Sequence, residues 1–446
     1  MSGFPSLKLR ATLLGYSALW WLGLPAALLY LRKRAKKDPD YGAHLGERFG
    51  RHAPWPEGPR TIWVHAVSLG EMRSAVPLIR AILARGERVV TTHFTPAGRR
   101  EAEAVFAPEI AAGTLRAVWV PFEFGFAYTR FFNTFRPALG LVMEVEIWPR
   151  MIMAARKAGL PLFMCNAQYP SKSYARDQRS GGLRGQIMRG VAGAMVKSDL
   201  QRQRFASVGV DPIEITGELR FDQPIPPHLP ARGIAARATL APHRPVLVLT
   251  SVVEGEDDLY ISAIKHAISK GYNPLFIYVP RAPERFETVF QMLTTAGLRV
   301  AKRSEILSPD LTLQATPELD VLLGNSMGEM YFYLAMGDTA LVGGGFIPKG
   351  AHNISEPLAL RKPVIVGPEI FTIEYPAMEA IAAGVVTHVT TAQALDDALE
   401  DFMQEMKNGL QDADIRDTSR IDDFLNAHAG SVEKTLNAMD RLAPPR

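Results

Sequence analysis

The chain has 446 residues, a formal net charge of +4 and 47% apolar residues. A chain of this length is too long for a single hydrophobic core of ordinary size, so we predict two domains. The net charge is small, and the sequence shows no stripe of Lys and Arg of the kind that binds nucleic acid. Cys165 is the only cysteine, which excludes an intramolecular disulfide and a zinc site built on cysteines.

The first predicted element is a membrane anchor. Residues 12–31 carry no charge and are long enough to span a bilayer, although Trp20 and Trp21 in mid-segment and Pro25, which breaks the helical pattern, leave a shallow insertion open. Five basic residues lie within positions 32–37, so the positive-inside rule keeps everything beyond them in the cytoplasm. We predict that residues 1–37 form an anchor whose basic flank faces anionic headgroups.

From residue 60 onward, short apolar runs alternate with helical patterns. Strands that are apolar almost throughout, separated by helices, indicate a parallel sheet covered on both faces. The first series is TIWVHAV, RVVTTHF, LRAVWVPF, ALGLVMEVE and LPLFMCNA; the second is RPVLVLTS, NPLFIYVPR, LDVLLG, TALVGGG, KPVIVGP and GVVTHV. We therefore predict two doubly wound α/β domains in tandem, with ligands at the carboxyl ends of the strands.

A proline-rich segment separates the two series. Residues 222–233 hold four prolines and show neither helical nor strand period. The predicted organisation is an anchor over residues 1–37, an N-terminal domain over 38–221, a linker over 222–244 and a C-terminal domain over 245–446.

The first candidate site follows the first strand. Ser68 and Glu71 have the S-x-x-E spacing of a helix capping box, and a cap is the favoured interpretation on spacing alone. The alternative is that Glu71 presents its carboxylate to a substrate. Glu144 and Glu146 end a later apolar strand two residues apart, which predicts that they share a face and that a cation or a bound polar group lies beside them. The alternative, equally open, is that the strand end simply turns polar as it leaves the core.

Two loops in the second half could bind one anionic ligand. Three glycines from Gly343 precede Asn353 and Glu356 at the opening of a helix, and Gly328 and Glu329 stand at another helix start. Glycines permit close backbone approach, and helix N-termini attract phosphate, although a tight strand-to-helix turn would show the same pattern. No Walker or GxGxxG motif fits.

A metal site is not expected. The ten histidines are scattered without an H-x-x-x-H or H-E-x-x-H arrangement. Asp412 and Asp414 are predicted to belong to a solvated polar face rather than to bind metal.

Taken in order, the motifs resemble those of the Kdo transferases, which attach 3-deoxy-D-manno-octulosonic acid (Kdo) from CMP-Kdo to the lipid A precursor at the inner membrane. The resemblance covers nearly the whole chain. It includes the anchor and then HLGERFG, WVHAVSLGE, MEVEIWP, ITGELRFD, APHRP, EGED, VPRAPERF, MGEM and GAHNISEP. It implies an inverting, metal-independent glycosyltransferase of lipopolysaccharide biosynthesis, with two Rossmann-like domains facing across a cleft (GT-B type) on the cytoplasmic face of the inner membrane.

The resemblance also implies roles for residues. Glu71 is the general base, which a helix N-terminus would keep ionised, and Glu144 and Arg220 are transition-state stabilisers, with Ser68 and Gly70 on the acceptor side. Contacts to the CMP donor are implied for Pro280, Arg281, Met327, Gly328, Glu329, Asn353, Ile354, Ser355 and Glu356. No cofactor and no nucleic-acid partner are implied; the partners are the lipid A precursor, a CMP-sugar and the membrane surface.

Several motifs depart from the usual family pattern, mostly in the C-terminal half. The differing positions are Gln168 for arginine, Arg220 for lysine, Val252 and Val253 for Thr-His, Ala282 for histidine, Asn325 for aspartate and Ala351 for glycine. Three interpretations therefore stay open: an active Kdo transferase, a related glycosyltransferase with another nucleotide-sugar donor, and a catalytically silent protein that binds lipid or nucleotide.

Overall fold

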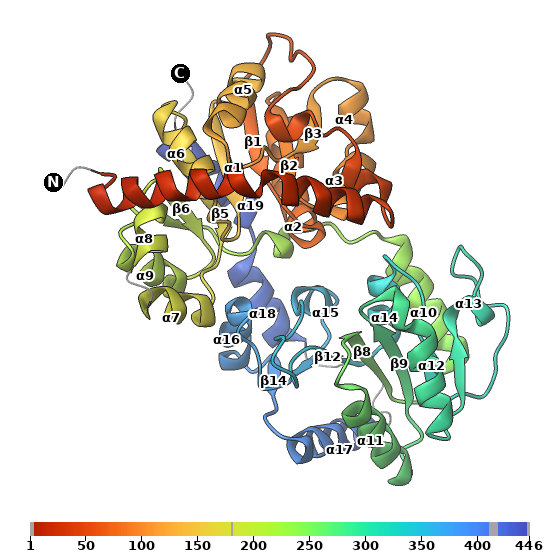
Figure 1. Cartoon of the computed structure of the whole chain (residues 1–446). Helices are drawn as coiled ribbons and strands as arrows, with labels where there is room; N and C mark the ends of the chain where they lie inside the picture. Colours follow the sequence, from red (N-terminus) through yellow and green to blue (C-terminus); the bar gives the residue numbers. More distant parts are fainter. Residues whose placement is uncertain (1–3, 180–181, 410–417, 444–446) are drawn as a thin grey trace. The chain divides into compact units, whose positions relative to one another are not determined.

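The computed structural model describes residues 4–179, 182–409 and 418–443; Asp412 and Asp414 lie outside them. The chain forms two compact units. Unit 1 comprises Met1–Gln223 and Gly430–Arg446, and unit 2 comprises Pro224–Ala429 (Figure 1).

Unit 1 is built on a seven-stranded parallel sheet in the order β3-β2-β1-β4-β5-β6-β7. Every residue of β1 and β4 is buried, because helices cover both faces of the sheet. The strands are β1 (Thr61–His65), β2 (Arg88–His93), β3 (Leu115–Trp119), β4 (Leu139–Met143), β5 (Leu162–Ala167), β6 (Gly193–Val196) and β7 (Ile213–Ile215). The helices between them are α2 (Leu69–Ala84), α3 (Pro96–Val105), α4 (Ala107–Ala111), α5 (Gly125–Phe135), α6 (Pro149–Lys157), α7 (Ser171–Arg179), α8 (Leu183–Met188) and α9 (Asp199–Ser207).

Unit 2 contains a second seven-stranded parallel sheet, in the order β10-β11-β9-β8-β12-β13-β14. Its strands are β8 (Val246–Val252), β9 (Leu275–Pro280), β10 (Val300–Lys302), β11 (Val321–Leu323), β12 (Thr339–Val342), β13 (Val364–Val366) and β14 (Val386–His388). Its helices are α10 (His228–Leu240), α11 (Asp257–Ser269), α12 (Phe286–Thr295), α13 (Arg303–Ile306), α14 (Met330–Met336), α15 (Ser355–Ala359), α16 (Glu374–Ala382), α17 (Ala392–Gly409) and α18 (Ser419–His428). The predicted α/β class with two parallel sheets is confirmed.

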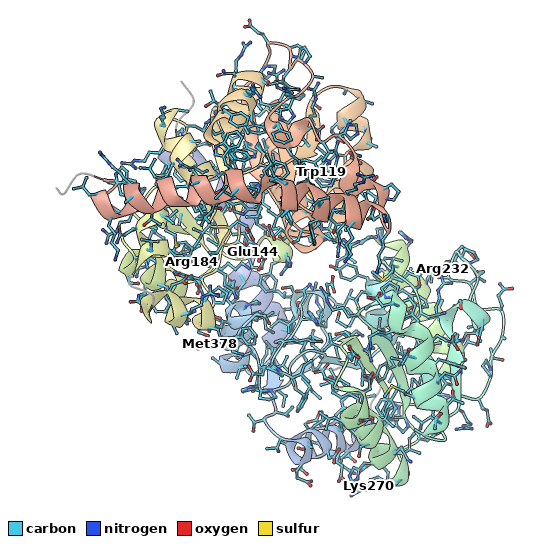
Figure 2. All side chains as sticks on the ribbon, in the orientation of Figure 1. Trp119, Glu144, Arg184, Arg232, Lys270 and Met378 are labelled. Carbon is cyan, nitrogen blue, oxygen red and sulfur yellow. The ribbon has the colours of Figure 1, made fainter. Side chains whose placement is uncertain are left out.

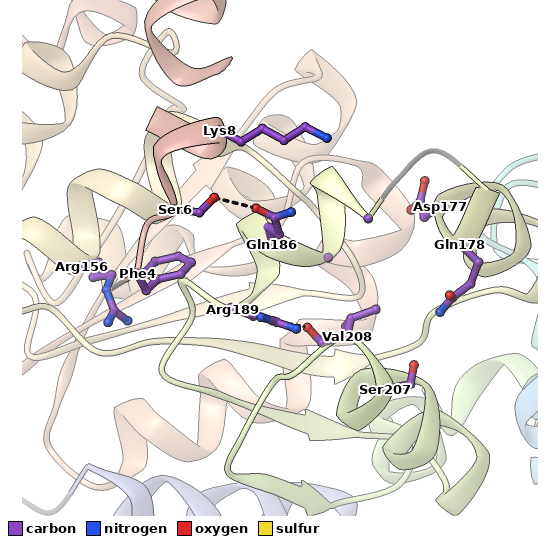
Figure 3. A pocket seen from close by; sticks show the side chains of 12 residues that line it. Phe4, Ser6, Lys8, Arg156, Asp177, Gln178, Gln186, Arg189, Ser207 and Val208 are labelled. Atoms are coloured by element: carbon purple, nitrogen blue, oxygen red, sulfur yellow. Dashed lines mark hydrogen bonds between the residues drawn. The ribbon is translucent and has the colours of Figure 1, made fainter. Parts of the chain in front are cut away.

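The N-terminal helix α1 (Leu7–Ala35) lies along unit 1 over most of its length (Figure 1). Near its start, Ser6 Oγ donates to Gln186 Oε1 at 3.0 Å, beside a cavity of about 550 Å³ (Figure 3). Further along, the Trp20 ring lies 5.8 Å from that of Phe122. Near the other end, Leu31 is buried against the same aromatic cluster.

The predicted break at Pro25 is wrong, because α1 continues through it. Proline removes one backbone donor, and packing on both sides of Pro25 holds the helix together. Trp21 lies 4.5 Å from the Phe124 ring before the proline, and Leu28 packs on the same cluster after it.

Two predicted domain boundaries also need correction. The predicted linker contains α10, whose Leu229, Ala236 and Leu240 are buried in unit 2, and Gly233 lets it approach the backbone of α14 closely. The last helix, α19 (Ser431–Leu442), belongs to unit 1 rather than to the C-terminal domain. Its Ala438 and Met439 pack into the core of unit 1, and the Asp222 carboxylate accepts from the N–H groups of Gly430 and Val432, at 2.9 and 2.6 Å.

Candidate functional site

The candidate site of unit 1 lies where the strand order of its sheet reverses. β1 has β2 on one side and β4 on the other, and ligands of open α/β sheets bind at the carboxyl ends of strands at such a switch point. The loop after β1 carries Ser68, Gly70 and Glu71, and Glu144 follows β4 directly. Arg220, in the short helix η3 (Leu219–Asp222), donates to the carbonyl of Gly70 at 3.5 Å, so the predicted residues of this half come together.

Glu71 is both a capping residue and a buried carboxyl group. The Ser68 hydroxyl caps α2 by accepting from the Glu71 N–H at 3.3 Å, and it donates to Glu71 Oε1 at 2.8 Å. The other carboxyl oxygen accepts from the N–H of Val67 at 2.9 Å. The predicted cap therefore forms, and it holds in one orientation a side chain that is only 8% exposed.

The environment of Glu71 favours its protonated form. Burial is the largest cause, followed by the negative charge of Glu144, and together they raise the pKa of Glu71 from an ordinary 4.5 to about 8. The hydrogen bonds from the Val67 N–H and the Ser68 hydroxyl lower the pKa of Glu71, but by less than burial and Glu144 raise it. The expectation that the helix N-terminus keeps Glu71 ionised at neutral pH is therefore wrong for this geometry.

Glu144 and Glu146 do not extend β4 as predicted. The strand ends at Met143, and Glu144 has a positive φ of 55°, which turns the chain out of the sheet (Figure 2 labels Glu144). Glu146 instead accepts from the indole N–H of Trp148 at 2.6 Å, and burial raises its pKa. Both carboxylates still act on Glu71, since each raises its pKa, so three acidic groups cluster at this edge.

A cation beside Glu144 was predicted, and Arg220 was among the predicted residues, but sequence reasoning missed the buried ion pair of Lys197 with Glu218. Lys197 follows β6 directly and is buried, with its Nζ 2.7 Å from Glu218 and 3.9 Å from Glu144. Arg220 lies 3.7 Å from Glu144. Burial alone would raise the pKa of Glu218, but Lys197, Arg220 and Asn166 together lower it to about 2. The only feature of the sequence that could have indicated the pair of Lys197 with Glu218 is a lysine at the carboxyl end of a short strand.

The predicted donor residues lie in unit 2, after three strands of its sheet. Pro280 ends β9, and the N–H of Arg281 donates to the carbonyl of Val252 at 2.9 Å. Met327, 56% exposed, and Gly328 follow β11. Asn353 accepts from the Ser355 N–H at 2.9 Å and opens α15, which Ile354 precedes and which contains Glu356. β9 pairs with β11 and β8, and β8 pairs with β12, so these loops share one sheet edge.

The carboxylate of Glu329 is already engaged within unit 2. Arg303 donates to both of its oxygens at 2.8 Å, and Ser326 donates to it as well. Glu329 therefore holds the loop that carries Met327 and Gly328.

The three glycines after β12 serve backbone packing inside unit 2. A Cβ on Gly344, where φ is +90°, would lie 2.4 Å from the carbonyl oxygen of Gly350, and one on Gly345 would lie 2.8 Å from the Gly367 nitrogen. The buried Glu256 fastens the loop by accepting from the N–H of Gly344 at 2.7 Å and of Phe346 at 3.1 Å.

His352 is a second residue that sequence reasoning missed. Burial and the charge of Arg281 lower its pKa to about 4, and its Nε2 has no hydrogen-bond partner among the described residues. A neutral imidazole at this strand edge is a polar group that a ligand could engage. Across the described ranges, no three His, Cys, Asp or Glu side chains are grouped to hold a metal ion.

Comparison with known proteins assigns the chain to a family. Residues 43–223 match the family model for 3-deoxy-D-manno-octulosonic-acid transferase. A 3-deoxy-D-manno-octulosonic acid transferase of Bordetella pertussis is 36% identical over 93% of this chain and 96% of its own length. The chain belongs to the Kdo transferase family. A second member, from Haemophilus influenzae, is 29% identical over 88% of this chain and 91% of its own. The chain is therefore a glycosyltransferase.

The fold of this Kdo transferase is shared with other glycosyltransferases. A crystal structure of a glycosyltransferase from Rickettsia africae matches with a TM-score of 0.55 at 12% identity, covering 86% of this chain and 99% of the other. At this identity the match concerns the fold alone, which is of the GT-B type.

Proposed function

We propose that this Kdo transferase moves Kdo from CMP-Kdo to the lipid A precursor in lipopolysaccharide biosynthesis, with inversion and without a metal ion. The observation that carries the proposal is the retention, in a chain of this family, of a buried carboxyl group at the switch point of unit 1. Glu71 is oriented by two hydrogen bonds and is flanked by acids and cations.

The proposed reaction is a single displacement. Glu71, in its ionised form, takes the proton of the acceptor hydroxyl as that oxygen bonds to the anomeric carbon of Kdo. The bond from that carbon to the CMP phosphate oxygen breaks, and CMP leaves with the electron pair. The carbon passes through an oxocarbenium-like state, which Glu144 and Arg220 stabilise; their side chains lie 3.7 Å apart.

The donor is proposed to bind unit 2 through its three strand-end loops. Arg281 supplies a positive charge for the phosphate or the sugar carboxylate, and Asn353 through Glu356 supply the loop at α15. Because Glu329 is paired with Arg303, we assign it the role of positioning Met327 and Gly328 for the nucleotide.

A screen of nucleotide sugars tests the donor. Full-length protein is mixed with the lipid A precursor and, in turn, CMP-Kdo, other CMP-sugars and UDP-sugars, all in EDTA, and nucleotide release is followed. Release from CMP-Kdo alone is expected. Release from another donor alone would replace the proposal with the related-glycosyltransferase alternative, and a requirement for added metal would contradict the metal-independent mechanism.

The pH dependence tests the base. Because Glu71 with a pKa of about 8 is protonated below that pH, kcat/KM should rise as the pH increases, with a midpoint near 8. Glu144→Gln removes a negative charge that raises this pKa, so the midpoint should move to lower pH even if the maximal rate falls. The measurement is kcat/KM from pH 6 to 9 for the wild type and Glu144→Gln. Identical midpoints would show that the ionisation of Glu71 does not cause the rise of kcat/KM with pH.

We propose that α1 embeds in the cytoplasmic leaflet of the inner membrane and does not cross it. Among the described residues, α1 is the one helix long and apolar enough to span a bilayer. Its contacts with unit 1 run from Ser6 to Leu31, so the helix cannot turn away from the unit without losing them. Large apolar side chains remain outward, including Leu22 at 80% and Leu29 at 65% exposure.

Charging this outward face should release the protein from membranes. In Leu22→Glu/Leu29→Glu, seven residues apart on one helix face, the lost burial of two leucines should lower membrane partitioning roughly 100-fold. Ile234→Glu, at a 62% exposed position of α10, is the matched control and should leave partitioning unchanged. Sedimentation with lipid vesicles measures the partitioning of both variants. Unchanged sedimentation of the double variant would mean that another surface of the protein binds the membrane.

A further inference from the structure

Arg48 is a buried cation whose guanidinium has no hydrogen-bonded counter-ion among the described residues. Its side chain is 1% exposed, and its Nε and both Nη atoms make no hydrogen bond in the described part of the chain. Its guanidinium lies 4.4 Å from the Trp119 ring centre (Figure 2 labels Trp119). The neighbouring Glu47 is paired with Arg99 at 2.8 Å. A guanidinium offers five donors in a fork that matches a carboxylate or a phosphate, so this group is equipped to bind such an anion.

A cavity of about 290 Å³ lies against Arg48. Two of its lining residues, Tyr16 and Trp20, come from α1. Arg48 comes from the short helix η2 (Glu47–Phe49), and the others come from the loops after β2, β3 and β4. Its apolar walls include Phe94 and Phe122. Such walls suit the hydrocarbon part of a ligand, and shielding from water strengthens the pairing of a buried cation with an anion.

The cavity adjoins the acidic cluster of unit 1. Phe94, on its wall, donates its N–H to the carbonyl of Val67 at 3.2 Å, and the N–H of Val67 donates to Glu71. Trp148, also on the wall, donates to Glu146 at 2.6 Å. A ligand in the cavity would thus touch the loops that orient the proposed base.

We propose that this cavity is a subsite for a phosphorylated lipid, whose phosphate pairs with Arg48 while its apolar chains run along Trp20 and Phe122 toward the membrane. This inference rests on the proposed function, because it gives the acceptor a second point of attachment beside Glu71. A lipid fits better than a soluble phosphate, because the membrane helix α1 forms one wall and most of the other lining residues are apolar. Glu123 also lines the cavity, and its carboxylate accepts hydrogen bonds from Tyr16, Tyr128 and the N–H groups of Arg150 and Met151.

Binding without catalysis tests the subsite. Full-length protein in uncharged detergent micelles is titrated calorimetrically with short-chain phosphatidic acid, diacylglycerol of the same chains, and inorganic phosphate. Phosphatidic acid should bind, and Arg48→Met should weaken it by about 10-fold or more, the usual effect of losing charge-assisted hydrogen bonds. Diacylglycerol should bind equally weakly to both proteins, and inorganic phosphate should not compete.

Matched variants separate this role from a structural one. Arg116 lies 4.8 Å from the Trp55 ring and donates to the carbonyl of Ala53 at 2.8 Å, so Arg116→Met removes a stacked arginine away from the cavity and should leave the affinity unchanged. Arg48→Lys keeps the charge and should bind with intermediate affinity. If Arg48→Met does not fold, Trp20→Ala tests the apolar wall of the cavity and should also weaken the binding of phosphatidic acid.

Equal affinity of wild type and folded Arg48 variants for phosphatidic acid would overturn the inference, as would competition by inorganic phosphate at similar concentration. The proposed function can fail separately. If the lipid binds in an Arg48-dependent way but no Kdo is transferred, only the proposed function is rejected. If Kdo is transferred and the KM for the acceptor is the same in the wild type and the Arg48 variants, only the subsite is rejected.

Discussion

Glu71→Gln is expected to lower Kdo transfer by about 10²- to 10⁴-fold, the contribution that a positioned general base makes. The change is isosteric but leaves no group able to accept the hydroxyl proton. CMP binding should be nearly unchanged, because the proposed donor residues all belong to unit 2. Single-turnover product formation and CMP titration measure the two properties.

Ser68→Ala separates the base from the cap. It removes the hydroxyl that accepts from the Glu71 N–H and donates to Glu71 Oε1, which should cost about 1 kcal/mol of stability, but it keeps the carboxylate and its hydrogen bond from the Val67 N–H. We expect most of the activity to survive in Ser68→Ala and to be lost in Glu71→Gln. Turnover retained by Glu71→Gln would remove Glu71 as the base and leave it a capping residue.

Lys197→Met is expected to have the largest effect on stability, about 3–5 kcal/mol, because it leaves the buried Glu218 without its partner at 2.7 Å. All six tryptophans of the chain lie in unit 1, so their fluorescence during urea unfolding reports on this unit. Arg85→Met breaks the half-exposed pair with Asp440 in the same unit and should cost no more than about 1 kcal/mol.

The pH dependence of this loss has a definite sign. Glu218 has a pKa of about 2 in the folded chain and an ordinary value of 4.5, so its stabilisation is present above pH 4.5 and is lost as the pH falls toward 2. The difference between wild type and Lys197→Met should therefore shrink at acidic pH. Lys197→Met/Glu218→Gln should recover part of the loss at neutral pH. A loss of stability in Lys197→Met that did not depend on pH would show that Lys197 stabilises the unit by packing.

The strands were predictable where they are long and apolar on both faces. β1, β2, β4, β8 and β9 each have five to seven residues, most of them buried, and such runs have few other interpretations. β6, β7 and β10 were missed, although β11, β13 and β14 are just as short and were predicted. The missed strands lack a clear apolar run: β7 contains Glu214, β10 ends at Lys302, and β6 begins with the small residues Gly193 and Ala194. The helix α10 was hidden by three prolines that precede it and by Pro230 in its first turn.

The candidate site was predictable to the extent that it follows strand ends. Glu71 and Glu144 could be found because each comes directly after an apolar run in a recognisable motif. The positive φ of Glu144 and the ion pair of Lys197 with Glu218 could not, since both depend on how loops from different strands meet. The raised pKa of Glu71 likewise depends on burial and on carboxylates distant in sequence.

The mass of the recovered lipid tests the central claim most directly. Full-length protein is incubated with CMP-Kdo and lipid A precursor, and the lipid is analysed by mass spectrometry beside a Glu71→Gln control. The account predicts that wild type adds Kdo to the lipid and that the control does not. An unchanged lipid with folded wild-type protein would contradict the proposed reaction.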